Sequence, residues 1–312
     1  MKPPLRMAAL GELLWDVLPE GQQLGGAPAN LAAMSAALSV PTEDQVFLVS
    51  CVGRDKLGKQ ACEDLATHHV RLDYIASDPE HPTGRVTVAL SAEAGPSYII
   101  HEGVAWDYIT ESPALQALAP TLDAVCFGTL AQRSAVTRTT LRRLVEASKP
   151  DCLRVFDVNL REPYWTPEAL LWGCTQATIL KMNHEEVPHV ALVAGAPAQE
   201  EKPLQVARYL LRRYPIQLVA ITRGGHGSLL VTRDGIHDHP GIPAKVVDTI
   251  GAGDAFTAAL THYALRHSSL AVLAEAANRW GSWVATQRGG MPHVDADTRN
   301  TVTAAIEAVR HA

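Results

Sequence analysis

The chain is poor in aromatic residues and cysteines, and it has no long apolar run. Aromatic residues make up 5% of the 312 positions, and the five cysteines form no C-x-x-C pair. An odd number of cysteines without such pairs argues against a disulfide framework and against a zinc knuckle. No stretch approaches the ~20 uninterrupted apolar residues of a membrane span, and the amino terminus lacks the apolar core of a signal peptide. We therefore expect a cytoplasmic protein.

Charge of one sign is not concentrated anywhere in the sequence. The 33 acidic and 27 basic residues give a net charge of −6 and are spread without long runs. Such a chain lacks the basic stripe that nucleic acids and anionic membranes attract, so we expect neither as a partner. An anionic ligand must then be held by a few local groups. With 47% hydrophobic residues, the chain can bury the core of one large domain spanning residues 1–312.

Short apolar runs alternate with helical patterns along most of the chain. The apolar runs predict strands at 7–14, 46–52, 124–127, 154–158, 178–181, 218–221 and 228–231. Helical periodicity lies between several of these runs, at 29–38, 56–68, 134–148 and 203–213. This alternation predicts a mostly parallel sheet with helices on both faces, and ligands in such sheets bind at the carboxyl ends of the strands. Polar residues stand at those ends, namely Asp157, Asn159, Asn183 and Thr222.

Two segments, about 13–24 and 83–106, break the alternation. Within the second segment, residues 85–90 and 97–100 alternate between apolar and polar side chains as hairpin strands do. We expect the two segments to pair into a small sheet that covers the site as a lid. The strands of such a lid have an exposed edge and apolar faces, which are a liability on a monomer, so we expect a homodimer formed through the lid.

Residues 248–256 carry more chemical information than any other stretch, and they read Asp-Thr-Ile-Gly-Ala-Gly-Asp-Ala-Phe. Apolar side chains recur at helical spacing from this point on, which predicts a helix that begins near 251–254. Gly251 and Gly253 allow a close approach of the backbone, and the free amides of the first helical turn favour an anion such as a phosphoryl group. Asp254 beside that anion is then suited to deprotonate an attacking hydroxyl. The alternative is that Asp254 only caps the helix.

Three other segments resemble known motifs but depart from them. Residues 53–60 match G-x-x-x-x-G-K, yet Gln60 stands where a P-loop needs a hydroxyl for magnesium. Residues 184–189 approach H-E-x-x-H, but the histidines are five apart and Pro188 interrupts the helix that must carry them. Residues 222–227 follow a strand without forming G-x-G-x-x-G, and they run into another predicted strand. A turn beneath a nucleotide suits them better.

Five segments, in this order along the chain, resemble motifs of the PfkB (ribokinase-like) carbohydrate kinase family, and fructokinases most of all. They are Gly25-Gly26-Ala27-Pro28-Ala29-Asn30, Val52-Gly53-x-Asp55-x-x-Gly58, Asn183-x-x-Glu186, Thr222-x-Gly224-x-x-Gly227 and Asp248 to Phe256. The resemblance covers almost the whole chain. It implies a ribokinase-like three-layer α/β/α sandwich around a mostly parallel sheet, with a small β-sheet lid, and the activity of an ATP-dependent sugar kinase.

The resemblance also implies roles for individual residues. Asp254 would be the catalytic base, and the amides of Ala252, Gly253 and Asp254 would stabilise charge on the transferring phosphoryl group. Gly251 would belong to the same catalytic turn. Asp16, Gly26 and Asn30 would bind the sugar, for which a carboxylate that only accepts hydrogen bonds is suited. The nucleotide would contact Asn183, Glu186, Thr222, Gly224, Gly227 and Asn278. Glu186 would hold Mg²⁺ through water, and Asp248 would contribute to a K⁺ site.

The choice of sugar depends on the segment Asp157-Val158-Asn159-Leu160-Arg161 with Trp165. It resembles the D-x-N-x-R…W segment shared by fructokinases and 2-keto-3-deoxygluconate kinases, so Asn159 and Arg161 are candidate substrate contacts. Arg161 can pair with a sugar-acid carboxylate, or it can brace the loop through salt bridges. Acid-specific kinases add a Y-x-R pattern from the lid, but residues 98–102 contain no arginine.

A neutral ketohexose is thus favoured, and the fructokinase resemblance implies phosphorylation of D-fructose at its 6-hydroxyl. Ala27 and Leu14 stand where ribokinases carry lysine and asparagine, which argues against ribose. Two alternatives stay open. One is a 2-keto-3-deoxygluconate kinase, and the other is a non-catalytic sugar-binding protein on a kinase scaffold, because a fold does not by itself establish turnover.

Overall fold

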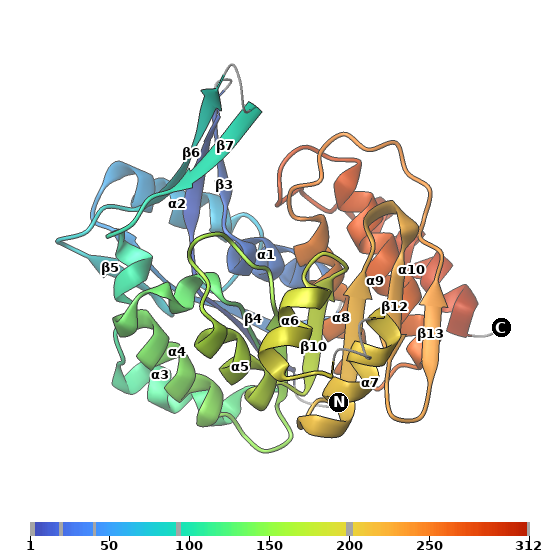
Figure 1. Ribbon diagram of the computed structural model, residues 1–312. Helices are drawn as coiled ribbons and strands as arrows, with labels where there is room; N and C mark the ends of the chain where they lie inside the picture. The colour runs from blue at the N-terminus through green and yellow to red at the C-terminus, as the bar shows by residue number, and fades with distance from the viewer. Residues whose placement is uncertain (1–3, 19–20, 40–41, 92–94, 198–201, 311–312) are drawn as a thin grey trace.

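The computed structural model describes residues 4–18, 21–39, 42–91, 95–197 and 202–310, whose strands form two sheets (Figure 1). The larger sheet has nine strands in the order β13-β12-β11-β10-β9-β8-β1-β4-β5. All neighbours from β5 to β11 pair in parallel, and β12 and β13 are added antiparallel at one edge. The strands are β1 (Arg6–Leu10), β4 (Gln45–Gly53), β5 (Ile75–Asp78), β8 (Ala124–Phe127), β9 (Leu153–Asp157), β10 (Ile179–Asn183), β11 (Leu218–Thr222), β12 (Ser228–Val231) and β13 (Ile236–His239).

Helices cover both faces of this sheet and enclose one apolar core on each side. On β1, Ala8 and Leu10 belong to one core while Met7 and Ala9 belong to the other, because successive side chains of a strand point to opposite faces. The first core is covered by α3 (Pro113–Leu118), α4 (Ala135–Glu146), α5 (Pro167–Gln176), α6 (Val187–Ala194) and α7 (Pro203–Arg213). The second is covered by α1 (Ala27–Ser39), α2 (Lys56–Ala66), α8 (Ala252–Ala264), α9 (Leu270–Ala285) and α10 (Ala296–Arg310).

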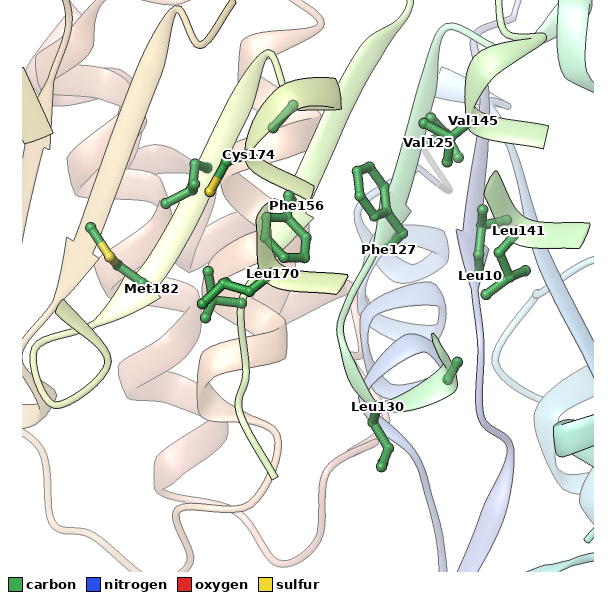
Figure 2. Packing of buried hydrophobic residues seen from close by; sticks show 14 of the residues in the cluster. Leu10, Val125, Phe127, Leu130, Leu141, Val145, Phe156, Leu170, Cys174 and Met182 are labelled. Atoms are coloured by element: carbon green, nitrogen blue, oxygen red, sulfur yellow. The ribbon is translucent and has the colours of Figure 1, made fainter. Parts of the chain in front are cut away.

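The centre of the first core is an aromatic contact between two neighbouring strands. The rings of Phe127 and Phe156 lie side by side, with centroids 5.3 Å apart (Figure 2). Gly173 of α5 packs on the second ring, since a Cβ there would lie 2.3 Å from a ring carbon of Phe156. The missing side chain lets α5 approach β9 closely, so the helix fixes the strand whose end carries Asp157.

The second sheet is small and projects from one side of the larger one, as β3, β6 and β7 show in Figure 1. Its four strands have the order β3-β2-β6-β7, with β2 and β6 parallel and the outer pairs antiparallel. They are β2 (Leu14–Leu18), β3 (Gly21–Gly25), β6 (Gly84–Ser91) and β7 (Gly95–Ile100). Residues 85–90 and 97–100 thus form the predicted hairpin. Beyond Ile100 the chain returns to the first core, where Trp106 is fully buried.

The predicted three-layer α/β/α fold with a small second sheet is confirmed, but one predicted strand was wrong. Residues 7–14 do not form a single strand, because β1 ends at Leu10 and β2 begins at Leu14 in the other sheet. Gly11 between them has a φ of 139°, a backbone conformation that favours glycine, and the chain leaves the main sheet there. β5 and β13 were not predicted, because their short sequences lack a continuous apolar run.

In the part of the chain that the structure describes, no helix combines the length and the apolar character needed to cross a bilayer.

Candidate active site

Polar side chains from several strands meet at the carboxyl edge of the large sheet. Glu12 follows β1, Asp157 ends β9, Asn183 ends β10 and Thr222 ends β11. Parallel strands end at the same edge, and α8 starts there as well, which is where an α/β sheet binds its ligands.

The first turn of α8 carries backbone amides that have no acceptor inside the helix. The N-cap is Gly251, whose φ is 75°, and a Cβ at this residue would lie 2.5 Å from the Cα of Gly290. The amide of Ala252 donates to the carbonyl of Thr249 at 3.3 Å. The amides of Gly253 and Asp254 belong to the first turn, where the helix itself offers no acceptor. These amides and the positive end of the helix form a site for an anion.

Asp254 is the third residue of α8 and does not occupy the N-cap position, so it is not the capping residue of the alternative interpretation. Its side chain is buried and accepts a hydrogen bond of 2.7 Å from Asn30 Nδ2. Burial and the nearby charge of Asp157 raise the pKa of Asp254 to about 6, against the lowering effects of Asn30, Lys181 and Arg161. The structure therefore brings together two predicted site residues that are 224 positions apart.

A buried ion pair lies beside Asp254, and sequence reasoning did not assign it. Lys181 of β10 binds both carboxylate oxygens of Asp157, at 3.0 and 3.1 Å, and Thr257 of α8 donates to the same carboxylate at 2.7 Å. Burial alone would lower the pKa of Lys181, but the carboxylates of Asp157, Glu186 and Asp254 raise it, so the ammonium stays charged. A Cβ on Gly253 would lie 3.2 Å from its Nζ. A positive charge therefore stands next to the amides that open α8.

Asn183 and Glu186 shape the turn that follows β10. The Asn183 Oδ1 accepts the amides of Glu185 and Glu186 at 2.8 and 3.0 Å. The buried Glu186 carboxylate accepts the amides of Leu160 and Asn183, each at 2.8 Å. Burial raises the pKa of Glu186, while Lys181 opposes the shift. Glu186 thus ties this turn to the loop after β9, and its oxygens keep lone pairs for a hydrated metal ion.

The predicted sugar contacts lie where the small sheet meets the large one. Asp16 is on β2, and Gly26 directly precedes α1. Burial raises the pKa of Asp16 to about 6, Arg161 lowers it and Asp248 raises it, so both charges act on this carboxyl. Gly26 has no room for a side chain, because a Cβ there would lie 2.4 Å from the carbonyl oxygen of Glu12. Asn159 has a φ of 38°, an uncommon conformation for a residue other than glycine.

A small cavity lies under these residues and contains a carboxyl group that sequence reasoning missed. Glu12 lines it together with Asp157, Asn159 and Asp254. Glu12 is 5% exposed. Burial is the main cause that raises the pKa of Glu12 to about 7, and the charge of Asp254 adds to it. The Glu12 amide, Arg161 and the amide of Ala27 act in the opposite direction. An acidic residue inside the apolar run 7–14 was the signal that could have indicated it, because such a residue is rarely fully buried unless it is paired.

We expect the substitution Glu12→Gln to weaken the pH dependence of stability. The pKa of Glu12 rises from 4.5 to about 7 in the folded chain, so the folded state keeps a proton that the unfolded state loses as the pH rises through this range. The folded wild type therefore loses stability between these pH values, on the order of 3 kcal/mol, and glutamine resembles the protonated acid. Urea unfolding at pH 5 and pH 8 measures this difference. An identical pH dependence in both proteins would contradict the prediction.

The turn at 222–227 connects two antiparallel strands and not a strand to a helix. It contains a short 3₁₀ helix, Gly224–His226, followed by Gly227 with a φ of 78°. A Cβ on Gly227 would lie 2.0 Å from the carbonyl oxygen of His239, so only glycine fits. Asn278 of α9 lies behind this turn and donates to Ser228 Oγ at 2.7 Å. The predicted nucleotide residues Thr222, Gly224, Gly227 and Asn278 are therefore neighbours.

Asp248 stabilises the turn that precedes α8. Its carboxylate accepts the amide of Ile250 at 3.0 Å and the amide of Gly289 at 3.1 Å. It thereby joins the turn before α8 to the loop after α9. Because its oxygens bind backbone amides, the side chain holds the shape of the predicted K⁺ region.

The motif-like segment 53–60 caps a helix, and the segment 184–189 does not carry its two histidines on one helix. Asp55 caps α2 by accepting the amide of Gly58 at 2.7 Å and binds the amide of Thr83 at 2.8 Å. Among the described residues, no group of three or more His, Cys, Asp or Glu side chains is placed to hold a metal ion. His184 precedes α6, so the two histidines do not share a helix.

Comparison with known proteins places the chain in one family. The model of the pfkB family carbohydrate kinases matches residues 17–297. An uncharacterized sugar kinase of Pyrococcus horikoshii is 31% identical over 265 residues, which cover 81% of each chain. An Escherichia coli fructokinase is 27% identical over 307 residues, covering 90% of this chain and 94% of the relative.

Solved structures agree with this fold. The sugar kinase of Pyrococcus horikoshii in complex with ATP has a TM-score of 0.79 and 28% identity, covering 95% of this chain and 99% of the other. The aminoimidazole riboside kinase of Salmonella enterica, complexed with aminoimidazole riboside and an ATP analog, has a TM-score of 0.74 and 25% identity, covering 95% and 99%. This chain therefore belongs to the pfkB family of carbohydrate kinases.

Proposed function

We propose that this carbohydrate kinase transfers the γ-phosphoryl group of ATP to the 6-hydroxyl of D-fructose, with Asp254 as the base. One observation carries the proposal. The buried carboxyl of Asp254 lies in the first turn of α8, held by Asn30 and next to the charge of Lys181. Few reactions other than phosphoryl transfer need an anion site, a base and a cation within one helical turn.

The chemistry follows from these positions. The Asp254 carboxylate takes the proton of the sugar hydroxyl as the hydroxyl oxygen forms its bond to the γ-phosphorus. The bond from that phosphorus to the β-γ bridging oxygen breaks, and ADP leaves with the electron pair. The amides of Gly253 and Asp254 stabilise charge on the equatorial oxygens, as preorganised donors do in such reactions. With a pKa of about 6, Asp254 is ionised at neutral pH. Its pKa is also close enough to neutral pH for the carboxylate to accept a proton from the hydroxyl.

The nucleotide would lie over the turn at 222–227, with its phosphates toward α8. Mg²⁺ in kinases is held mainly by phosphate oxygens and water, with one or two carboxylates. Glu186 fits this role, since its carboxylate is buried, fixed by two backbone amides and close to Lys181. When bound, the ion supplies positive charge to the transferring phosphoryl group. Two relatives of this fold bind ATP or an ATP analog, which supports the choice of nucleotide.

The sugar would bind between the small sheet and α1, with Asp16, Gly26, Asn30, Asn159 and Arg161 around it. Arg161 acts electrostatically on three carboxyl groups of the chain itself, those of Asp16, Glu12 and Asp254. Because the Arg161 charge already interacts with these carboxyl groups, a carboxylate on the substrate would gain less from it, which favours a neutral sugar. The similarity to a fructokinase supports fructose among the neutral sugars.

A panel of acceptors tests the proposal. ADP release is measured with Mg-ATP and D-fructose, 2-keto-3-deoxygluconate, ribose or adenosine, each with and without K⁺. We expect turnover with fructose to be at least about tenfold above that with every other acceptor. The gain or loss of a single binding contact is enough for a difference of this size. Preference for the keto acid would instead make Arg161 a carboxylate clamp and contradict the choice of fructose. ATP turnover with none of them, despite sugar binding in calorimetry, would support a non-catalytic protein.

Two further features belong to this proposal. K⁺ would bind near Asp248, among carbonyl groups of the turn before α8 and of the loop after α9, and the panel with and without K⁺ tests it. The small sheet would act as a lid and form the contact of a homodimer. Its outer strands have no neighbour on one side in the described chain, and Ile99 on β7 is 49% exposed.

A further inference from the structure

The loop that carries Arg161 contacts the small sheet at a second point. A tight turn links Arg161 to Tyr164, whose amide donates to the Arg161 carbonyl at 2.7 Å. The Tyr164 hydroxyl donates to the carbonyl of Ile100 at 2.8 Å. Ile100 is the last residue of β7. A single four-residue turn therefore joins the predicted sugar loop to the end of a strand in the other sheet.

This hydrogen bond occupies a backbone carbonyl on the outer edge of the small sheet. Within the described residues β7 is an outer strand of the small sheet, paired only with β6. An unpaired backbone carbonyl at a buried position is costly, and Ile100 is buried. The Tyr164 hydroxyl satisfies this carbonyl. The next carbonyl, of His101, accepts a hydrogen bond of 2.6 Å from Arg133.

Arg133 lies behind this contact and binds several groups at once. Its guanidinium group lies 4.0 Å from the ring centroid of Trp106 and 4.9 Å from that of Tyr164. It also pairs with the buried Asp107 at 2.8 Å through two nitrogens. The ring of Tyr164 is therefore held by packing, and its hydroxyl is aimed at β7 independently of the sugar.

The same turn also acts on β2. The charge of Arg161 lowers the pKa of Asp16, which lies on that strand. Both ends of the turn thus act on the small sheet, Arg161 at an inner strand and Tyr164 at an outer strand.

We propose that Tyr164 is a positioning residue that couples the sugar loop to the small sheet through its hydrogen bond to Ile100. A sugar that orders the loop at Asn159 and Arg161 then also fixes where β7 leaves the sheet, and the sheet restricts the loop in return. The role of the loop in sugar binding rests on the proposed function, whereas the link between loop and sheet does not.

The substitution Tyr164→Phe removes only the hydroxyl and keeps the ring on Arg133. Tyr209→Phe is the matched control, because the Tyr209 hydroxyl also donates to backbone carbonyls, those of Ala194 at 3.1 Å and Gly195 at 2.9 Å. Neither carbonyl belongs to the small sheet. Hydrogen–deuterium exchange of the free proteins measures the link directly. In Tyr164→Phe we expect amides at 99–101 to exchange about three- to tenfold faster, the effect of one lost hydrogen bond.

Exchange rates at 99–101 that equal those of the wild type and of Tyr209→Phe would overturn the proposal, whether or not the protein phosphorylates a sugar. The sugar arm uses D-fructose. In the wild type it should slow exchange at both 159–165 and 95–101, and in Tyr164→Phe only at 159–165. The KM for fructose should rise about three- to tenfold in this variant with the KM for ATP unchanged. Equal protection of both segments in the variant would also overturn the coupling. Faster exchange at 99–101 without turnover of any sugar would support the link and contradict the proposed function.

Discussion

Replacement of Asp254 with asparagine is expected to lower kcat by about 10²- to 10⁴-fold, the usual contribution of a general base. Asparagine keeps the size of the side chain and a carbonyl oxygen for the Asn30 amide, but it cannot take the proton of the sugar hydroxyl. Binding of the sugar should change far less than turnover, since the role proposed for Asp254 is to accept the reacting proton. Steady-state kinetics and calorimetry with the sugar measure the two effects separately.

The control for this substitution is Asp234→Asn, which removes an exposed carboxylate at the turn between β12 and β13. It should retain wild-type turnover. A kcat for Asp254→Asn within about threefold of the wild type would be far below the contribution of a general base and would contradict the assignment.

The wild-type enzyme should also lose activity in acid. The pKa of Asp254 is raised to about 6, so the carboxylate needed as a base is protonated as the pH falls through this value. The kcat/KM should fall about tenfold per pH unit below it, because this quantity reports the free enzyme. A profile that stays flat down to pH 5 would show that no group with this pKa acts as the base.

The second large effect is expected from Lys181→Met, which should lower the free energy of unfolding by about 3–5 kcal/mol. The substitution removes the cation that binds both oxygens of the buried Asp157. Among the described residues, the Thr257 hydroxyl then remains as the hydrogen-bond donor to that charge. An uncompensated buried charge is costly, whereas loss of both charges costs little. Chemical denaturation measures the effect.

The double substitution Asp157→Asn with Lys181→Met is the control, because it removes both charges and keeps a polar partner for Thr257. It should recover most of the lost stability. If the single substitution costs less than about 1 kcal/mol, the value of an exposed pair, the Lys181 ammonium does not stabilise a buried carboxylate as described.

Local patterns in the sequence were sufficient to predict most strands of the large sheet and the helix α8 that follows Gly251. The apolar runs predict the first and last residues of β8 and β12 correctly. A strand that is buried on both faces needs apolar side chains at successive positions. Gly251 has a φ of 75°, a backbone conformation that favours glycine, so the turn before α8 is also encoded locally.

The network of side chains behind Asp254 could not be predicted from these patterns. Asp157 and Lys181 are 24 positions apart, and Asp157 and Thr257 are 100 apart, so only the folded sheet brings them together. The signal for Lys181 was a lysine inside a predicted buried strand, which is rare unless the charge is paired. The contact between Tyr164 and Ile100 depends on how two sheets are placed, and periodicity carries no information about that.

The most direct test of the proposed function is to follow phosphorus NMR signals while the enzyme acts on Mg-ATP and D-fructose. The account predicts that ADP and fructose 6-phosphate appear in equal amounts and that no free phosphate accumulates. Release of ADP with free phosphate, or phosphorylation at another hydroxyl, would contradict the proposed reaction.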